Sequence, residues 1–274
     1  MSGSISDSLK EATQMLRDAG VPEARREAGS LLSFVISKDR TFLISHAEDL
    51  VATEALKRFR DAVTRRAAGE PLQYITGVQD FFGREFRVTP DVLIPRPETE
   101  LLVEAALEAI ANEATPTICD VGTGSGCIAI TLLCERRDAR AVALDISPAA
   151  LEVAAQNARR HGVEERIVFK VSDCFETVDS EFELIVSNPP YVSADALSGL
   201  QREVKDHEPL VALSPGADGL SVIRRLLEDG QAFLKKSGHL IMEIGFDQGE
   251  KVQGLIDSKI WQLVEIRPDL QGIP

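Results

Sequence analysis

The sequence predicts an α/β protein in which a doubly wound domain with a parallel sheet follows a small helical bundle and a β-hairpin linker. Two observations lead to this prediction. From residue 117 onward, short apolar runs alternate with amphipathic segments, which is typical of parallel strands joined by crossover helices. Upstream of that point, apolar residues recur at helical spacing instead. We therefore expect three parts, covering residues 1–72, 73–95 and 96–274.

Residues 1–72 are expected to form a helical domain. Gly20 and Pro22 separate its first two helices, because glycine favours a helix end and proline a helix start. Gly69 and Pro71 end its last helix in the same way. The expected helices cover residues 6–19, 22–37 and 52–68.

The linker at residues 73–95 and the domain after it follow different patterns. Short β-like segments flank a turn at residues 82–86, so we expect a hairpin. Pro97 then opens an amphipathic helix, because proline suits a first helical turn. The expected strands of the α/β domain cover residues 118–121, 141–145, 167–171, 183–187, 239–244 and 261–266. Its later expected helices cover residues 127–135, 148–161, 220–234 and 248–256.

The composition limits the class of protein. Thirty Lys and Arg residues against 44 Asp and Glu residues leave a net charge of -14, which works against binding of long nucleic acids and favours a protein or a cationic small molecule as partner. No apolar run approaches the roughly 20 residues that span a membrane, and the first ten residues lack the apolar core of a signal peptide. We expect a cytoplasmic protein with neither a nucleic-acid nor a membrane partner.

The cysteines and histidines show no spacing typical of metal ligands. The four cysteines form no C-x-x-C pair, and the four histidines form no H-x-x-x-H pair. Cys119, Cys127 and Cys134 lie in apolar surroundings and are interpreted as reduced, buried small residues. No metal site is expected.

The strongest local signal is the stretch Gly122-Thr123-Gly124-Ser125-Gly126 between an apolar strand and a helix. Glycines let the backbone turn tightly and let a ligand approach it closely. The spacing G-x-G-x-G differs from the G-x-G-x-x-G of dinucleotide binders, and no lysine follows as in a phosphate loop. A nucleoside with an amino-acid tail, such as S-adenosylmethionine, therefore fits better than a ligand with phosphates.

Two further strand ends supply candidate cofactor contacts. Asp145, followed by Ile146, ends the second strand, where a carboxylate can accept from both ribose hydroxyls. Dinucleotide-binding folds place an acid similarly, so Asp145 alone leaves the choice of cofactor open. After the third strand, Asp173 can accept from the adenine amine, and Cys174 or Phe175 can cover the ring. A capping role for Asp173 in a turn is an alternative interpretation.

The tetrapeptide Asn188-Pro189-Pro190-Tyr191 directly follows an apolar strand. Each proline restricts the residue before it to extended geometry and donates no hydrogen bond. The Asn188 side-chain oxygen and the Pro189 main-chain oxygen can therefore accept from two N–H groups on one nitrogen, while Tyr191 stacks on the flat group that carries it. This geometry predicts methyl transfer to an amide or aromatic amine nitrogen. Asn188, Pro189 and Tyr191 are the predicted catalytic residues, and the whole tetrapeptide is the predicted substrate site.

With these motifs the chain resembles the peptide chain release factor glutamine methyltransferases, the HemK or PrmC family. Three further segments share the likeness, namely residues 71–77, 82–88 and 92–100. These segments distinguish the family from other methyltransferases, which the catalytic core alone does not. The resemblance implies a Rossmann-like class I methyltransferase domain, S-adenosylmethionine as cofactor and S-adenosylhomocysteine as product. Family members usually continue past a segment like residues 269–274 into one more strand, so we expect either a shortened chain or a sheet without that strand.

The resemblance also implies a substrate and roles for individual residues. The methyl group would go to the side-chain nitrogen N5 of the glutamine in the Gly-Gly-Gln motif of class 1 release factors. The turn at residues 122–126 would hold the methionine part, Asp145 the ribose, and Cys174 would flank the adenine. Asn188 would touch both cofactor and glutamine. The resemblance further implies that the helical domain at residues 1–72 would be a docking surface for the release factor.

Three other functions remain possible from the sequence. A nucleic-acid adenine N6-methyltransferase would present the same two N–H donors to the tetrapeptide, but the net charge and the segment at residues 93–100 count against it. A non-catalytic binding module would be expected to have lost a ligand residue, yet Gly122, Gly124, Asp145 and Asn188 are all present. An NAD-dependent oxidoreductase is disfavoured by the glycine spacing.

Overall fold

The computed structural model describes residues 3–269 and 272–273. The segment at residues 269–274, after which family members usually continue into one more strand, therefore lies partly outside the described residues. The chain forms two compact units. The first consists of Met1–Gly77 together with Gln201–His207, and the second of Val78–Leu200 together with Glu208–Pro274. The short second piece of the first unit comes from within the sequence of the predicted α/β domain.

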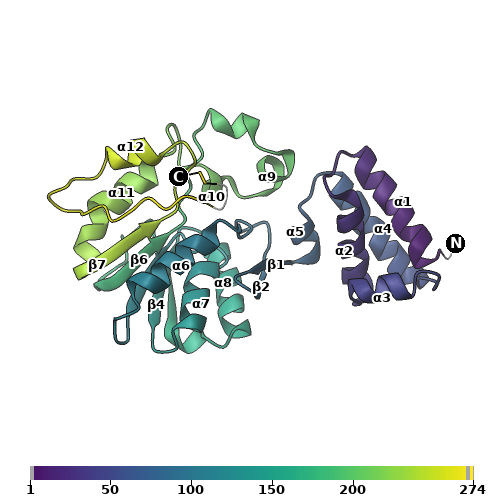
Figure 1. Cartoon of the computed structure of the whole chain (residues 1–274), viewed down its shortest axis with the longest axis horizontal. Helices are drawn as coiled ribbons and strands as arrows, with labels where there is room; N and C mark the ends of the chain where they lie inside the picture. Colours follow the sequence, from purple (N-terminus) through teal and green to yellow (C-terminus); the bar gives the residue numbers. More distant parts are fainter. Residues whose placement is uncertain (1–2, 270–271, 274) are drawn as a thin grey trace. The chain divides into compact units, whose positions relative to one another are not determined.

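The first unit contains a helical bundle, as the sequence predicts (Figure 1). Its N-terminal helices are α1 (Ile5–Asp18), α2 (Ala24–Ile36), α3 (Arg40–Ser45), α4 (Thr53–Ala67) and α5 (Leu72–Thr76). Helices α1, α2 and α4 correspond to the three predicted helices. Helices α3 and α5 were missed because such short helices show too few turns for an apolar periodicity. The side chains of Leu16, Leu31 and Phe59 lie fully buried between the longer helices.

Arg66 joins α9 (Arg202–His207) to this bundle. Its guanidinium lies 2.7 Å from the Glu203 carboxylate and also pairs with Glu27 of α2. The Arg66 side chain is 5% exposed, so both ion pairs are shielded from water. The segment Gln201–His207 therefore belongs structurally to the helical unit, which the sequence did not indicate.

The second unit is an α/β domain with a five-stranded parallel sheet, which confirms the predicted fold class (Figure 1). Its strands are β3 (Thr117–Val121), β4 (Arg140–Asp145), β5 (Ile167–Val171), β6 (Phe182–Ser187) and β7 (Leu234–Met242). The spatial order is β5-β4-β3-β6-β7. The chain moves outward from β3 to β5 and then returns to place β6 on the other side of β3. The carboxyl ends of β3 and β6 thus meet where the order reverses, which is where such sheets bind ligands.

Helices and a separate hairpin complete this unit. The hairpin pairs β1 (Val78–Phe81) with β2 (Arg84–Arg87), as predicted for the linker. The helices are α6 (Thr99–Ala109), α7 (Cys127–Glu135), α8 (Pro148–Arg160), α10 (Leu210–Leu213), α11 (Ser221–Asp229) and α12 (Gly249–Gln253). Short 3₁₀ turns lie at Glu164–Arg166, Ala196–Gly199 and Gly230–Phe233.

Two elements near the C-terminal end were predicted wrongly. Residues 261–266 form no strand in the described structure; the Trp261 indole instead donates to the main-chain oxygen of Leu227 at 3.0 Å, so a side chain anchors this segment. The helix expected at residues 220–234 ends at Asp229, because Gly230 begins a 3₁₀ turn and β7 begins at residue 234. Apolar spacing alone could not separate a helix from a strand over so short a run.

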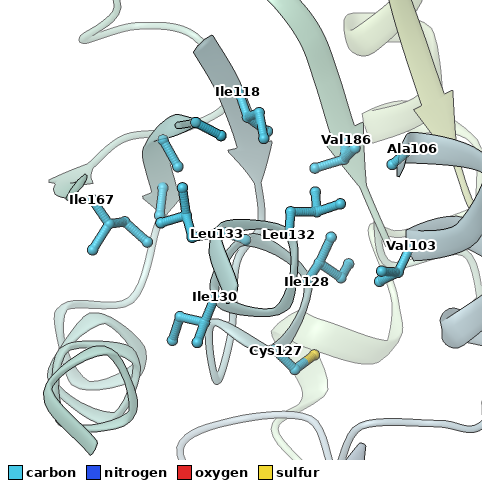
Figure 2. Close-up of a cluster of buried hydrophobic side chains, with 14 of the residues drawn as sticks. Val103, Ala106, Ile118, Cys127, Ile128, Ile130, Leu132, Leu133, Ile167 and Val186 are labelled. Atoms are coloured by element: carbon cyan, nitrogen blue, oxygen red, sulfur yellow. The ribbon is translucent and has the colours of Figure 1, made fainter. Parts of the chain in front are cut away.

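The apolar core of the α/β unit surrounds helix α7. Ile128, Leu132 and Leu133 of this helix are buried on different sides of it. Figure 2 shows Leu133 on the side of Ile167 and Ile128 on the side of Val103. Because α7 is enclosed by apolar neighbours, its N-terminus is held firmly at the end of the glycine-rich turn.

Gly126 lets α7 pack closely against α8. Its φ angle is +81°, and an added Cβ would lie 2.7 Å from Ile130 Cδ1 and 3.1 Å from Ala154 Cβ. We expect Gly126→Ala to lower the free energy of unfolding by about 1–3 kcal/mol through overpacking alone, measured by urea denaturation. Gly162→Ala is the matched control, because its φ of +66° is similar but no atom lies within 4 Å of the added Cβ. Equal losses in the two variants would contradict this packing role.

Candidate active site

A cavity of about 420 Å³ lies at the carboxyl ends of strands β3 to β6. Its volume is within the usual range for small-molecule sites. Most of the residues predicted from sequence line it, namely Gly122, Thr123, Gly124, Ser125, Asp145, Ile146, Asp173, Cys174, Asn188, Pro189 and Pro190. Gly126 and Tyr191 are not among the described residues that line this cavity.

Asp145 holds the glycine-rich turn in place. Its Oδ2 accepts from the main-chain nitrogen of Gly124 at 2.9 Å, and its Oδ1 accepts from that of Ser147 at 2.9 Å. Burial raises the pKa of Asp145, while these hydrogen bonds from backbone N–H groups oppose the shift. A carboxylate has about four acceptor positions, so Asp145 can also accept from the hydroxyl groups of a ligand.

Asp120 lies fully buried at the end of β3, next to the glycine-rich turn. Its Oδ2 accepts from Thr123 Oγ1 at 2.7 Å and from the main-chain nitrogen of Ala129 at 3.3 Å. Its Oδ1 has no hydrogen-bond partner among the residues that the structure describes. Burial raises the pKa of Asp120 to about 7. No role was predicted for this residue from the sequence, although an acid two positions before the first glycine was a visible signal.

The raised pKa of Asp120 makes stability depend on pH. The pKa rises from 3.8 to about 7, so the folded state binds more protons than the unfolded state between these values. We therefore expect the contribution of Asp120 to the free energy of unfolding to fall by a few kcal/mol as pH rises through this window, and to level off above it. Asp120→Asn should flatten that slope in urea titrations at a series of pH values. A variant with the original slope would contradict this prediction.

The residues after β5 form a second wall of the cavity. Burial raises the pKa of the Cys174 thiol to about 11, so the thiol stays neutral and offers an apolar surface. Asp173 Oδ1 accepts from Nη1 of Arg225 at 2.6 Å, and Arg225 itself lines the cavity. Phe175 stacks on Phe233 with 4.9 Å between ring centroids and belongs to the apolar core. Of the two residues predicted to cover the adenine ring, Cys174 is therefore the one that lines the cavity.

Asn188 stands directly beside the glycine-rich turn. Strand register pairs Asp120 of β3 with Val186 of β6, and Ser187 Oγ donates to the main-chain oxygen of Val121 at 2.7 Å. Nδ2 of Asn188 donates to Oγ1 of Thr99 at 3.1 Å. In the described structure no donor is bonded to Oδ1 of Asn188, so this oxygen can accept from a ligand.

Tyr191 is tied to the segment that follows β7. Its hydroxyl donates to Oε1 of Glu243 at 3.3 Å, and Nε2 of Gln248 donates to its main-chain oxygen at 3.0 Å. Burial raises the pKa of Tyr191, and the Glu243 charge adds to this shift. The structure thus brings Asn188, Pro189 and Pro190 to the cavity and fixes Tyr191 through partners that the sequence did not reveal.

Two kinds of feature are absent from the described part of the chain. Among residues 3–269 and 272–273, no three His, Cys, Asp or Glu side chains are grouped so that they could hold a metal ion. No helix within the same residues has the length and apolar character needed to cross a membrane.

Comparison with known proteins gives matches over nearly the whole chain. Residues 7–77 match the family described as PrmC N-terminal domain, and residues 97–204 match the family described as Methyltransferase small domain. A release factor glutamine methyltransferase of Cereibacter sphaeroides is 46% identical over 266 residues, which cover 97% of this chain and 94% of that protein. A protein of the same name from Koribacter versatilis is 42% identical over 272 residues, covering 98% of this chain and 96% of that protein. A bifunctional methyltransferase of Rickettsia felis is 36% identical over 300 residues and is covered to 57% of its own length.

Proposed function

Since the chain belongs to the release factor glutamine methyltransferase family, we propose that it methylates the glutamine side-chain nitrogen N5 in the Gly-Gly-Gln motif of class 1 release factors. It is an S-adenosylmethionine-dependent methyltransferase. One observation carries the proposal: Asn188 and Pro189 line the same cavity as the glycine-rich turn and Asp145. A methyl donor and an amide acceptor can therefore meet in one site.

The cavity fits S-adenosylmethionine, which supplies a methyl group activated by a positively charged sulfur. At two glycines of the turn Gly122–Gly126, Gly122 and Gly124, no atom lies within 4 Å of an added Cβ, so a ligand can approach the backbone closely. We propose that this turn holds the methionine part and that Asp145 and Ile146 hold the ribose. Asp173 and Cys174 would flank the adenine, with the neutral thiol against the ring.

The substrate amide would be held by the tetrapeptide. Oδ1 of Asn188 and the main-chain oxygen of Pro189 would accept from the two N–H groups of the glutamine side chain, which leaves the nitrogen aimed at the methyl group. The nitrogen gains the methyl group and releases one proton. Correct positioning can lower the barrier by about 7–11 kcal/mol, and fixed dipoles can add about 3–4 kcal/mol. Pro190 keeps the acceptors in extended geometry, and Tyr191 would pack against the flat amide.

The helical domain at residues 1–72 would dock the release factor. Large apolar side chains are exposed on it at Met15, Phe34, Ile44 and Leu50. Such side chains are common where one protein binds another. The match of residues 7–77 to the PrmC N-terminal domain supports the same role. Because release factors act during translation, we place the reaction in the cytoplasm.

The alternative of adenine methylation in nucleic acids is not favoured. The relatives that match nearly the whole chain carry the release factor name, and the net charge of -14 opposes phosphate binding. No observation on the described residues supports this alternative over the proposed reaction.

Transfer of a tritiated methyl group from S-adenosylmethionine tests the proposed function. The unaltered chain should label an intact class 1 release factor and should not label a factor whose Gly-Gly-Gln glutamine is replaced by alanine. A short peptide with the same motif should be labelled with a higher KM, because it lacks the surface that docks on the helical domain. Label in DNA or RNA, or label that survives loss of the glutamine, would refute the proposal.

A further inference from the structure

Two hydrogen bonds in series connect the Asn188 amide to a buried carboxylate. Nδ2 of Asn188 lies 3.1 Å from Oγ1 of Thr99, and Oγ1 of Thr99 lies 2.6 Å from Oε2 of Glu243. Thr99 begins helix α6 and is 2% exposed, whereas Glu243 directly follows strand β7. Three elements that are distant in sequence therefore meet at the carboxyl end of β6.

The direction of these hydrogen bonds is set by Glu243. An ionised carboxylate only accepts, so the Thr99 hydroxyl has to give its single proton to Glu243. The Thr99 oxygen can then only accept, and the part of the Asn188 amide that faces it has to be the NH₂ group. With the amide turned over, two acceptor oxygens would face each other without a proton between them, which is unfavourable in a buried place.

The same carboxylate also holds the other end of the tetrapeptide. Its Oε1 accepts from the Tyr191 hydroxyl at 3.3 Å, and the main-chain nitrogen of Glu243 donates to the oxygen of Ser187 at 3.0 Å. Burial raises the pKa of Glu243, while the hydrogen bonds from Thr99, Tyr191 and the Asn188 side chain favour the ionised form. A neutral carboxyl would carry a proton of its own that also needs an acceptor, so two hydroxyl donors, one on each oxygen, fit the ionised form better.

We infer that Glu243, acting through Thr99, is a positioning residue that keeps Oδ1 of Asn188 turned toward the substrate amide. The inference rests on the proposed function, because it concerns the same acceptor oxygen. Glu243 acts on the reaction only by way of Asn188, through Thr99 and through its own hydrogen-bonding interaction with the Asn188 side chain. Its loss should therefore lower kcat more than it weakens binding of S-adenosylmethionine.

Thr99→Val tests the inference, because valine has nearly the shape of threonine but no hydroxyl. We expect kcat for release factor methylation to fall by about 10-fold to 100-fold, as misplacement of a positioned group does. The dissociation constant of S-adenosylmethionine, measured by calorimetry, should stay nearly unchanged even though Thr99 lines the cavity. Thr99→Ser keeps the hydroxyl and should retain most of the kcat.

Thr117→Val is the matched control. Oγ1 of Thr117 donates to Oε2 of Glu183 at 2.7 Å, which is the same kind of threonine–glutamate pair at the opposite end of the sheet. This variant loses an equivalent hydrogen bond and should keep the kcat of the unaltered chain. A fall in kcat as large as that of Thr99→Val would show that any such loss disturbs the domain.

Glu243→Gln provides a second test of the inference if Thr99→Val folds poorly. A carboxamide can donate to Thr99, which lets Thr99 donate to Oδ1 of Asn188 and turns the amide over. We expect a lower kcat, with little change in melting temperature. Unchanged kcat in folded Thr99→Val or in folded Glu243→Gln, or a kcat in Thr99→Ser as low as that of Thr99→Val, would overturn the inference. Failure of the proposed function would look different, because the unaltered chain itself would then transfer no methyl group to the release factor.

Discussion

Replacing Asn188 with alanine is expected to lower kcat by about 10²-fold to 10³-fold, the usual effect of losing one fixed dipole aimed at the reacting group. The variant lacks the side-chain oxygen that would accept from the glutamine amide, so one N–H group of the substrate has no partner. The nitrogen is then no longer aimed at the methyl group. Cofactor affinity should change far less, because the glycine-rich turn and Asp145 remain in place. Single-turnover methylation and calorimetry with S-adenosylhomocysteine measure the two effects separately.

The matched control for this change is Asn112→Ala. Asn112 is exposed, follows helix α6 and is not among the residues that line the cavity. It should keep the kcat of the unaltered chain. An Asn188→Ala variant with unchanged kcat would remove Asn188 from the catalytic residues. One with lost cofactor binding and unchanged turnover at saturation would assign it to the cofactor site alone.

Replacing Asp145 with alanine is expected to weaken S-adenosylmethionine binding by about 10-fold to 100-fold, since a hydrogen bond to a charged group contributes about 1.5–3 kcal/mol. Two effects add in the same direction. The ribose loses its acceptor, and the main-chain nitrogens of Gly124 and Ser147 lose the oxygens that fix the turn. With saturating cofactor, kcat should recover in large part, because Asn188 and Pro189 are untouched.

Asp80→Ala is a suitable control for the Asp145 variant. Asp80 is exposed on the hairpin strand β1 and does not line the cavity. Its removal should leave the dissociation constant measured by calorimetry unchanged. A wild-type dissociation constant in Asp145→Ala would exclude this carboxylate from the ribose site.

The sheet could be predicted from sequence where each strand is followed by a strong local signal. Strand β3 runs into the glycine-rich turn and β6 into the prolines, so both strand ends were located correctly. Strand β7 covers residues 234–242, whereas the sequence predicted a helix up to residue 234 and a strand only at residues 239–244. Its position depends on pairing with β6, which is a contact that local patterning does not encode.

The site shows the same division between local and distant information. The glycine-rich turn and the tetrapeptide are each contiguous in sequence, so their residue types alone predicted the ligand class. The partners that orient them were not predicted, because Thr99 lies 89 residues from Asn188 and 144 residues from Glu243 along the chain. Arg225, which holds Asp173, lies 52 residues from it. Only the folded sheet and the helices packed on it bring these groups together.

The most direct test of the central claim is a crystal structure of the chain with S-adenosylhomocysteine and a peptide that contains Gly-Gly-Gln. We expect the ribose hydroxyls within hydrogen-bond distance of Asp145 and the adenine against Cys174. The glutamine amide nitrogen should donate to both Oδ1 of Asn188 and the main-chain oxygen of Pro189. A nucleoside bound away from the glycine-rich turn, or a glutamine amide held by other residues, would contradict the proposed site.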